Sequence, residues 1–130
     1  MNKNIYNKIK INKKFSYKRK ITLKDTKNFI KIVKDENKLH KIKINNKILV
    51  HGFLLNSLIA RVLGTVFVVK KNLLVSCSLR YLGQTFVNDT IKIDLKIKKI
   101  IKLFDLISFD IRISVEKKNV ALGECTIKLF

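Results

Sequence analysis

The sequence predicts an α+β domain in which an antiparallel sheet wraps around a central buried helix. The segment 51–65 is apolar on nearly every side of a helix, and a helix of that kind must be buried. The chain that follows alternates apolar and polar residues in four stretches, as strands with one buried face do. A sheet with one apolar face buries both itself and such a helix by wrapping around it.

Length and composition are typical of one domain. The chain has 130 residues, and 47% of them are hydrophobic, which is enough for a core. Lys, Asn or Asp interrupts every apolar run before it reaches the roughly 18 residues of a membrane span, so we expect no span. The amino terminus lacks the apolar stretch of a secretory signal and the Arg/Ser bias of a mitochondrial presequence. We expect a cytoplasmic protein, with an organellar matrix as the alternative.

The first half of the chain contains a basic arm, a short helix and a loop. Residues 1–14 are rich in Lys and Asn without a sustained period, and we expect a loose basic arm before a domain that spans 15–130. Thr22 and Asp25 form the pattern of a capping box, which starts an amphipathic helix that ends near Lys34. The polar stretch that follows predicts a loop.

The second half supplies the central helix and the sheet. The helix begins near His51, and Gly64 is its expected terminator. Cys77 and Cys125 lack the spacing of a disulfide framework or a zinc site, and both are expected as small core residues on apolar strand faces. At least four strands should follow the helix, and an exposed edge of so small a sheet favours a homodimer.

Two polar clusters at the ends of the helical segments are candidates for chemistry. Asp35 and His40 lie five residues apart in one loop, so both side chains can act on a single water molecule. Gly52 lies at the start of the buried helix, where unpaired backbone N–H groups and the helix dipole favour negative charge on a carbonyl oxygen. These groups together suit proton chemistry next to a carbonyl, although polar residues in such a loop are more often solvated turn formers.

Read together, the two clusters resemble the MaoC-like (R)-specific enoyl-CoA hydratases and 3-hydroxyacyl-thioester dehydratases, which have a hot-dog fold. Their loop has the form Asp-x-Asn-Pro-x-His, and their central helix starts with His-Gly-Met/Phe-Leu. The similarity continues through SLRYLGQTFVNDTIKI and GECTIKLF and covers roughly 14–130. The chain departs from the pattern where Lys38 replaces proline, and where 40–51 is shorter than usual. The matching residues are Asp35, Asn37, His40, His51, Gly52, Phe53 and Leu54.

The resemblance implies reversible hydration of trans-2-enoyl thioesters to (R)-3-hydroxyacyl thioesters in fatty-acid metabolism. Asp35 and His40 would be the catalytic acid/base pair, and the Gly52 amide would polarise the thioester carbonyl. Asn37, His51 and Ser57 would have supporting roles. Asn37 would hold the loop, and a histidine in the position of His51 more often packs or caps a helix than catalyses. Neither a metal nor an organic cofactor is expected.

Three other functions stay open. The first is a catalytically degenerate hot-dog domain that binds acyl groups or serves only for dimerisation. The second is an acyl-thioester hydrolase. Retention of Asp35 and His40 at the family's spacing favours the hydratase over both. The third is a nucleic-acid-binding protein, which the net charge of +20 suggests. The low arginine content argues against it, since only Arg19, Arg61, Arg80 and Arg112 of the 29 basic residues are arginines. A basic surface suits acyl-CoA or acyl carrier protein, with a preference for the carrier protein.

Overall fold

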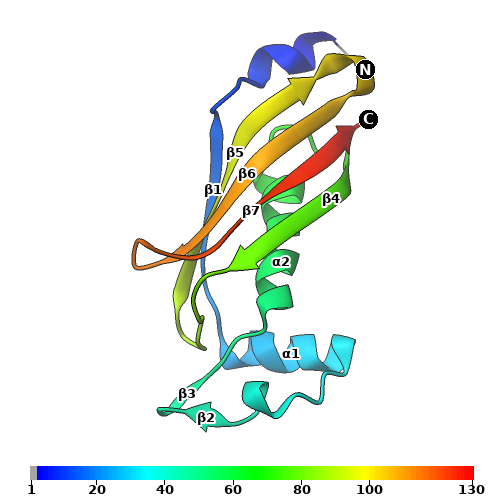
Figure 1. Cartoon of the computed structure of the whole chain (residues 1–130). Coiled ribbons are helices and arrows are strands. Elements are labelled where there is room, and N and C mark those ends of the chain that lie inside the picture. The colour runs from blue at the N-terminus through cyan, green and yellow to red at the C-terminus, as the bar shows by residue number, and fades with distance from the viewer. Residues whose placement is uncertain (1–2) are drawn as a thin grey trace.

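The computed structural model describes residues 3–130 and contains a five-stranded antiparallel sheet with two helices (Figure 1). The strand order is β1-β5-β6-β7-β4, so β1 and β4 are the two edges. A separate two-stranded hairpin and α1 lie beyond one end of the sheet (Figure 1). The main elements are β1 (Lys14–Lys20), α1 (Leu23–Val33), α2 (Gly52–Arg61), β4 (Asn72–Tyr81), β5 (Thr90–Ile101), β6 (Leu106–Val115) and β7 (Lys118–Leu129).

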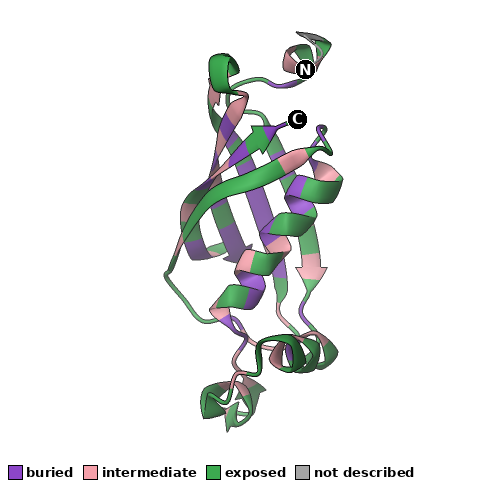
Figure 2. Ribbon diagram, turned by 90° about the vertical axis from the view of Figure 1, so that its right-hand side faces the viewer, coloured by how far each residue is buried: buried purple, intermediate pink, exposed green. Residues whose placement is uncertain are grey.

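The predicted sheet wrapped around a helix is confirmed. Buried residues recur at alternate positions along much of β5, β6 and β7, on the sheet that α2 lies against (Figure 2). Leu55 and Ile59 of α2 belong to the same buried core. The Phe67 ring packs edge-on against Phe15 and Phe109, with ring centroids 5.1 and 5.4 Å apart. Such close interdigitation of apolar side chains is what stabilises the fold.

The capping box at the start of α1 is also confirmed. The Thr22 hydroxyl accepts from the Asp25 N–H at 3.2 Å, and an Asp25 carboxylate oxygen accepts from the Thr22 N–H at 2.9 Å. The helix ends at Val33, and Lys34 adopts the left-handed conformation that ends many helices. After this turn the chain runs back beneath α1 towards β2 and β3 (Figure 1).

The predicted loop contains a short hairpin. β2 (Lys43–Ile44) pairs with β3 (Lys47–Ile48), and Asn45 and Asn46 between them both have positive φ, as a two-residue hairpin turn requires. The Val87 N–H donates to the Ile48 carbonyl at 2.9 Å, which ties the hairpin to the segment before β5.

The expectation of a loose amino-terminal arm is wrong for the residues that the structure describes. Lys3–Lys8 forms a 3₁₀ helix, η1, and Ile9 after it is only 3% exposed. The Tyr6 hydroxyl donates to Asp105 Oδ1 at 2.6 Å, and burial together with this carboxylate raises the pKa of Tyr6 to about 12. Two anchors in a segment with few apolar residues were enough to order it.

Gly64 does not terminate the central helix. The chain continues from α2 into a π-helical segment, η3 (Val62–Val66), in which the Phe67 N–H donates to the Val62 carbonyl at 2.8 Å. No glycine among the described residues has positive φ, so Gly64 does not form a left-handed cap.

The edge strands hold the other differences. Cys125 is buried as expected, whereas Cys77 is exposed, because β4 is the edge strand and α2 covers little of its inner face. β1 was not expected at all, because the basic side chains on one face of the stretch KFSYKRK obscure its alternation. Among residues 3–130, no helix is both long and apolar enough to cross a membrane.

Candidate active site

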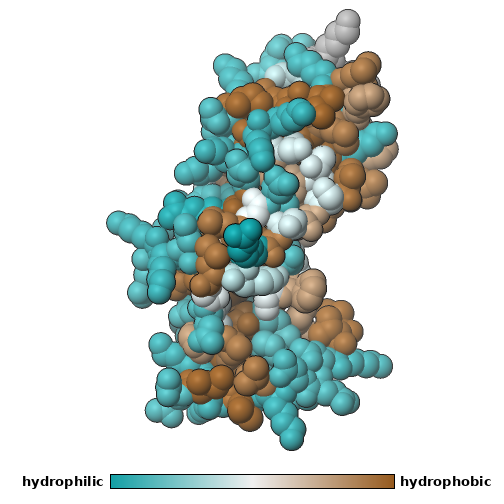
Figure 3. Space-filling view, viewed as in Figure 1, coloured by the Kyte–Doolittle hydropathy of each residue, from teal (hydrophilic) through white to brown (hydrophobic). Residues whose placement is uncertain are grey.

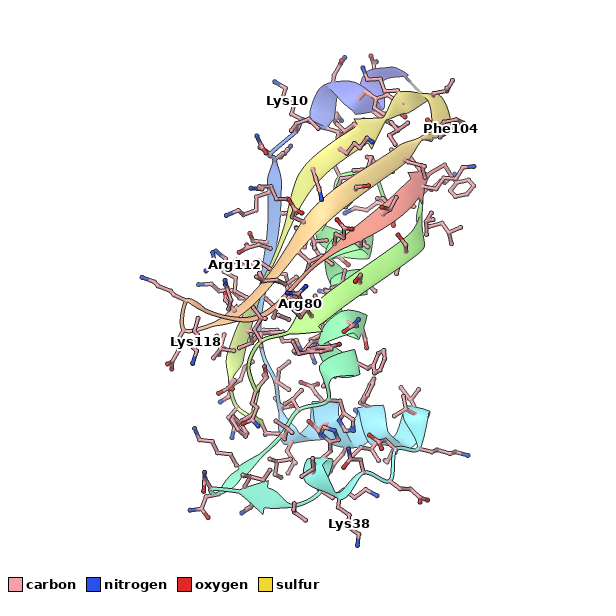
Figure 4. The ribbon with its side chains drawn as sticks, in the orientation of Figure 1. Lys10, Lys38, Arg80, Phe104, Arg112 and Lys118 are labelled. Carbon is pink, nitrogen blue, oxygen red and sulfur yellow. The ribbon has the colours of Figure 1, made fainter. Side chains whose placement is uncertain are left out.

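The loop after α1 is shaped by local hydrogen bonds in place of the missing proline. Asp35 Oδ1 accepts from the Asn37 N–H at 2.8 Å, and Asn37 Oδ1 accepts from the Leu39 N–H at 3.0 Å. Asn37 thereby caps the single 3₁₀ turn Lys38–His40, called η2. The Lys38 side chain is exposed and points away from the molecule (Figure 4). Asn37 therefore holds the loop, and the position of Asp35 is fixed by backbone geometry.

His51, at the start of α2, lies closest to Asp35. Its Nε2 is 3.0 Å from Asp35 Oδ2, and the residue is only 4% exposed. The Phe29 ring of α1 packs against it at 5.0 Å between centroids. Among the described residues the Asp35 carboxylate is the polar group that His51 Nε2 approaches, and His51 Nδ1 has no hydrogen-bond partner there. The His51 side chain does not cap the helix either.

His40 lies on the other side of His51. The two imidazole rings stack at 3.6 Å between centroids, with 20° between their planes. His40 Nδ1 is 2.9 Å from the Leu49 carbonyl, which can only accept, so Nδ1 carries the proton. In the neutral ring, His40 Nε2 then holds the free lone pair, as a general base requires.

The surroundings set the charge of the acid and of the buried histidine. The backbone N–H of Asn37, followed by the two histidines, holds the pKa of Asp35 below its usual value of 3.8, so Asp35 is a carboxylate at neutral pH. Burial, with a further contribution from His40, lowers the pKa of His51 below 6.5 despite the opposing effect of Asp35. His51 is therefore neutral at neutral pH.

These side chains line a cavity of about 290 Å³ at the amino-terminal end of α2. Gly52 borders it and is the first residue of the helix, where backbone N–H groups have no partner within the helix. A carboxylate, an imidazole lone pair and a helix amino terminus thus face one space. We call it the catalytic cavity after the role proposed for it below; its lining is Phe29, Val33, Asp35, His40, His51, Gly52 and Phe53.

A second cavity of about 340 Å³ also borders Gly52 and shares His40, Gly52 and Phe53 with the first. Tyr81 of β4 lines it, and its hydroxyl donates to Asn56 Oδ1. A Cβ atom at Gly52 would lie 2.8 Å from Tyr81 Cζ, so only glycine permits this close approach. Sequence reasoning did not identify Tyr81, because its alternating strand pattern gives no sign that it reaches the helix.

A third cavity of about 320 Å³ is mostly apolar and lies beside α1 and α2. Phe29 borders both this cavity and the catalytic cavity, so one aromatic ring separates the two. Ser57 lines this apolar cavity, and its hydroxyl donates to the Phe53 carbonyl at 2.8 Å. The structure therefore does not bring Ser57 into the catalytic cavity.

One ligand atom each of Asp35, His40 and His51 lie within 4.8 Å of one another, a set that raises the question of a metal ion. The stacked rings fit an ion poorly. The lone pair of an imidazole lies in the plane of its ring, and two nearly parallel planes 3.6 Å apart do not direct their lone pairs to one point between them. The arrangement of the three side chains suits proton transfer better than metal binding.

By sequence, the chain matches no protein-family model and no curated protein. Its structure is similar to that of an (R)-hydratase from A. caviae involved in PHA biosynthesis, with a TM-score of 0.86, 21% identity, and 94% of this chain and 98% of that chain covered. The chain has the hot-dog fold. R-hydratase PhaJ1 from Pseudomonas aeruginosa gives a TM-score of 0.87 at 21% identity, covering 95% of this chain and 84% of that one.

Hot-dog proteins with another reaction are also similar. The fluoroacetyl-CoA thioesterase FlK has a TM-score of 0.73 at 6% identity, covering 94% of this chain and 88% of that chain. The resemblance to MaoC-like hydratases is thus confirmed at the level of the fold. The likeness establishes the fold and not the reaction.

Proposed function

We propose that the protein is an (R)-specific enoyl-thioester hydratase, equally able to run as a 3-hydroxyacyl-thioester dehydratase. The observation that supports this most is the meeting of Asp35, His40 and the amino terminus of α2 at one cavity. Hydration of an alkene conjugated to a thioester needs a base for water and a stabilised carbonyl oxygen, and this cavity offers both.

In the proposed reaction one water molecule supplies both added groups. Its oxygen bonds to C3 of the enoyl thioester while one member of the pair, the Asp35 carboxylate or His40 Nε2, removes a proton from it. The other member accepts a hydrogen bond from the O–H that stays on C3. The removed proton then passes to C2, so that OH and H are added and both side chains regain their starting states. Negative charge develops on the thioester oxygen as the C3–O bond forms, and the Gly52 N–H donates to it.

His51 acts in this proposal by positioning. It is buried and neutral, it contacts Asp35 with Nε2, and its ring stacks on His40. An uncharged imidazole in contact with both catalytic groups holds them in place without competing for the proton at neutral pH. Asn37 has a similar positioning role through the loop backbone.

The apolar cavity beyond Phe29 is the proposed site of the acyl chain, because burying apolar surface there is favourable and the cavity adjoins the catalytic one. For the carrier, the basic surface suits the phosphates of coenzyme A or an acidic acyl carrier protein. We favour the carrier protein, whose larger acidic surface can contact more lysines. A marked preference for acyl-CoA over the carrier-protein thioester would contradict that choice.

The deciding experiment follows the loss of enoyl absorbance when crotonyl-CoA, or crotonyl carrier protein, is mixed with the purified protein. We expect hydration that falls by about 10²–10⁴-fold in Asp35→Asn, because proton transfer to a positioned side chain contributes that much. Asp110→Asn is the matched control, since Asp110 lies on β6 and its nearest ion pair is with Lys98 at 3.9 Å.

The same samples distinguish the alternatives. A thioesterase would release free thiol without hydrating the alkene, and a thiol reagent would detect it. A binding or dimerisation module would show neither change. Either result would replace the hydratase proposal.

We further propose that the protein is a homodimer that pairs along β4. This edge strand exposes apolar side chains, with Leu73, Leu74 and Val75 at 57%, 47% and 55% exposure, and an unpaired edge of this kind invites pairing. The inner-face position of exposed Cys77 is consistent with a surface that a second copy covers.

A further inference from the structure

We call residues 35–48, which carry Asp35 and His40, the catalytic loop, after the proposed function. The opposite end of the sheet carries exposed apolar side chains. The turn between β5 and β6 is a single 3₁₀ turn, η4 (Lys102–Phe104), in which Leu103 is 83% exposed and Phe104 61% exposed. Figure 4 shows Phe104 at this end and Lys38 of the catalytic loop at the other. A fold does not need two such residues to project into water, so their exposure calls for a partner.

A third apolar residue joins them through the carboxyl terminus. The Leu129 N–H donates to the Asp105 carbonyl at 2.8 Å, and the Phe130 N–H donates to the Lys71 carbonyl at 3.0 Å. These bonds bring the last residues of β7 next to the β5–β6 turn. Phe130 is 61% exposed. We call Leu103, Phe104 and Phe130 the apolar tip; brown side chains gather at this end of the molecule in Figure 3.

Lysines surround the apolar tip. Exposed lysines lie in the β5–β6 region, at the end of β7 and just before β4; they are Lys71, Lys99, Lys102 and Lys128. Lys102 Nζ lies 5.4 Å from the Tyr6 ring centre, and Lys128 Nζ lies 5.8 Å from that of Phe130, so both lysine stems follow aromatic surface. The acidic residue of the turn, Asp105, accepts a hydrogen bond from Tyr6. The tip is therefore strongly cationic around an apolar centre.

We propose that the apolar tip binds the surface of an anionic phospholipid bilayer. Leu103 and Phe104 would enter the boundary between headgroups and acyl chains, and the lysines would contact lipid phosphates, the usual division between apolar and basic residues at such surfaces. The exposed apolar side chains of the projecting turn, with lysines beside them, match the apolar and anionic layers at the surface of such a bilayer. The bound molecule keeps its catalytic loop in water, at the far end (Figure 1).

The first test is co-flotation of the full chain with vesicles of phosphatidylcholine, alone or with about 30 mol% phosphatidylserine. We expect binding to the anionic vesicles, and about tenfold weaker partitioning for Leu103→Ser/Phe104→Ser. The matched control removes two exposed apolar side chains from the opposite end, in Leu39→Ser/Ile42→Ser, and should bind as the natural chain does. Equal loss in both double variants would overturn the proposal.

The net charge of +20 makes a charge control essential, because such a protein adsorbs to anionic lipid without a specific site. Lys99→Glu/Lys102→Glu and Lys24→Glu/Lys27→Glu change the net charge equally, the first at the tip and the second on α1. We expect the tip pair to lose more binding than the α1 pair. The same loss in both would mean adsorption by total charge and would overturn the proposal.

A tryptophan can report on insertion, because the chain has none. In Phe104→Trp, the emission should shift to the blue with anionic vesicles and be quenched by brominated lipid, whereas Ile42→Trp should show neither. The absence of a shift in Phe104→Trp with bound vesicles would overturn the proposal. So would a blue shift without vesicles that grows with protein concentration, because it would identify the tip as a self-association surface.

Discussion

At the scale of single residues, the site depends on a histidine held neutral by burial. His51 is 4% exposed, and burial of its imidazole away from water disfavours the charged imidazolium form. The Asp35 carboxylate opposes this effect at 3.0 Å but does not overcome it. The free energy of unfolding therefore depends on His51 remaining unprotonated in the folded chain.

The lowered pKa of His51 predicts how stability changes with pH. Below 6.5 the unfolded chain protonates this histidine while the folded chain does not, so the unfolded state binds more protons and the free energy of unfolding falls as pH falls. In His51→Asn this part of the fall should vanish. Urea midpoints measured between about pH 5 and pH 7.5 check it.

Asp35 provides an internal comparison for that experiment. Its pKa is lowered from 3.8, so the stability it contributes is present above that value and is lost only at more acidic pH. A pH dependence of His51→Asn identical to that of the natural chain between about pH 5 and pH 7 would contradict the burial argument.

The sequence allowed Asp35, His40 and Gly52 to be proposed, because their spacing matches a known motif. The structure places all three at one cavity. It did not allow the direct contact between Asp35 and His51 to be predicted. That contact depends on the left-handed turn at Lys34 and on the packing of Phe29 against His51, which arise from tertiary structure. Ser57 was misplaced because sequence position does not tell which face of α2 lines which cavity.

At the scale of elements, close backbone approach limits which glycines can be replaced. Gly123 of β7 lies against β4, where an added Cβ would be 1.9 Å from the Ser78 carbonyl oxygen. Backbone in a paired strand cannot move away without breaking the β4–β7 ladder. At Gly64, by contrast, an added Cβ meets nothing within 4 Å.

Gly123→Ala should therefore lower the free energy of unfolding by about 3 kcal/mol or more, in the range of overpacked cores and broken hydrogen bonds. Gly64→Ala is the matched control, and we expect it to be neutral or to stabilise by about 0.5–1 kcal/mol, because alanine restricts the unfolded chain. Denaturant unfolding of both variants measures the difference. Similar stability in the two variants would show that β4 does not approach β7 this closely.

The elements themselves were largely predictable. The strands β5, β6 and β7 each bury one face, so their period of two survives in the sequence, and the Thr22–Asp25 box marked the start of α1. β1 and the inner face of β4 escaped prediction, since an edge strand has neighbours on one side only and its apolar residues need not be buried.

At the scale of the whole molecule, the β4 edge predicts self-association. Sedimentation should give twice the 15.2 kDa of one chain. Leu74→Lys places a charge on the exposed edge and should shift the protein towards monomer, because an edge charge opposes strand pairing. Lys96→Leu on β5, away from that edge, should leave the mass unchanged.

The exposed Cys77 gives an independent measure of the same interface. Its reaction with a thiol reagent should slow as protein concentration rises, because pairing along β4 would cover it. A mass of one chain at all concentrations, with constant reactivity of Cys77, would rule out the β4 dimer.

Few hydrogen bonds attach the catalytic loop to the rest of the domain. The segment from Asp35 to Ile48 holds to the segment before β5 through the Val87 N–H bond to Ile48 and an isolated bridge between Leu49 and Phe86. Its own hydrogen bonds are exposed, which gives a segment low local stability. Detachment of this loop would carry Asp35 and His40 away from Gly52 while the sheet stays folded, so under the proposed function mild denaturant should abolish activity before the sheet unfolds.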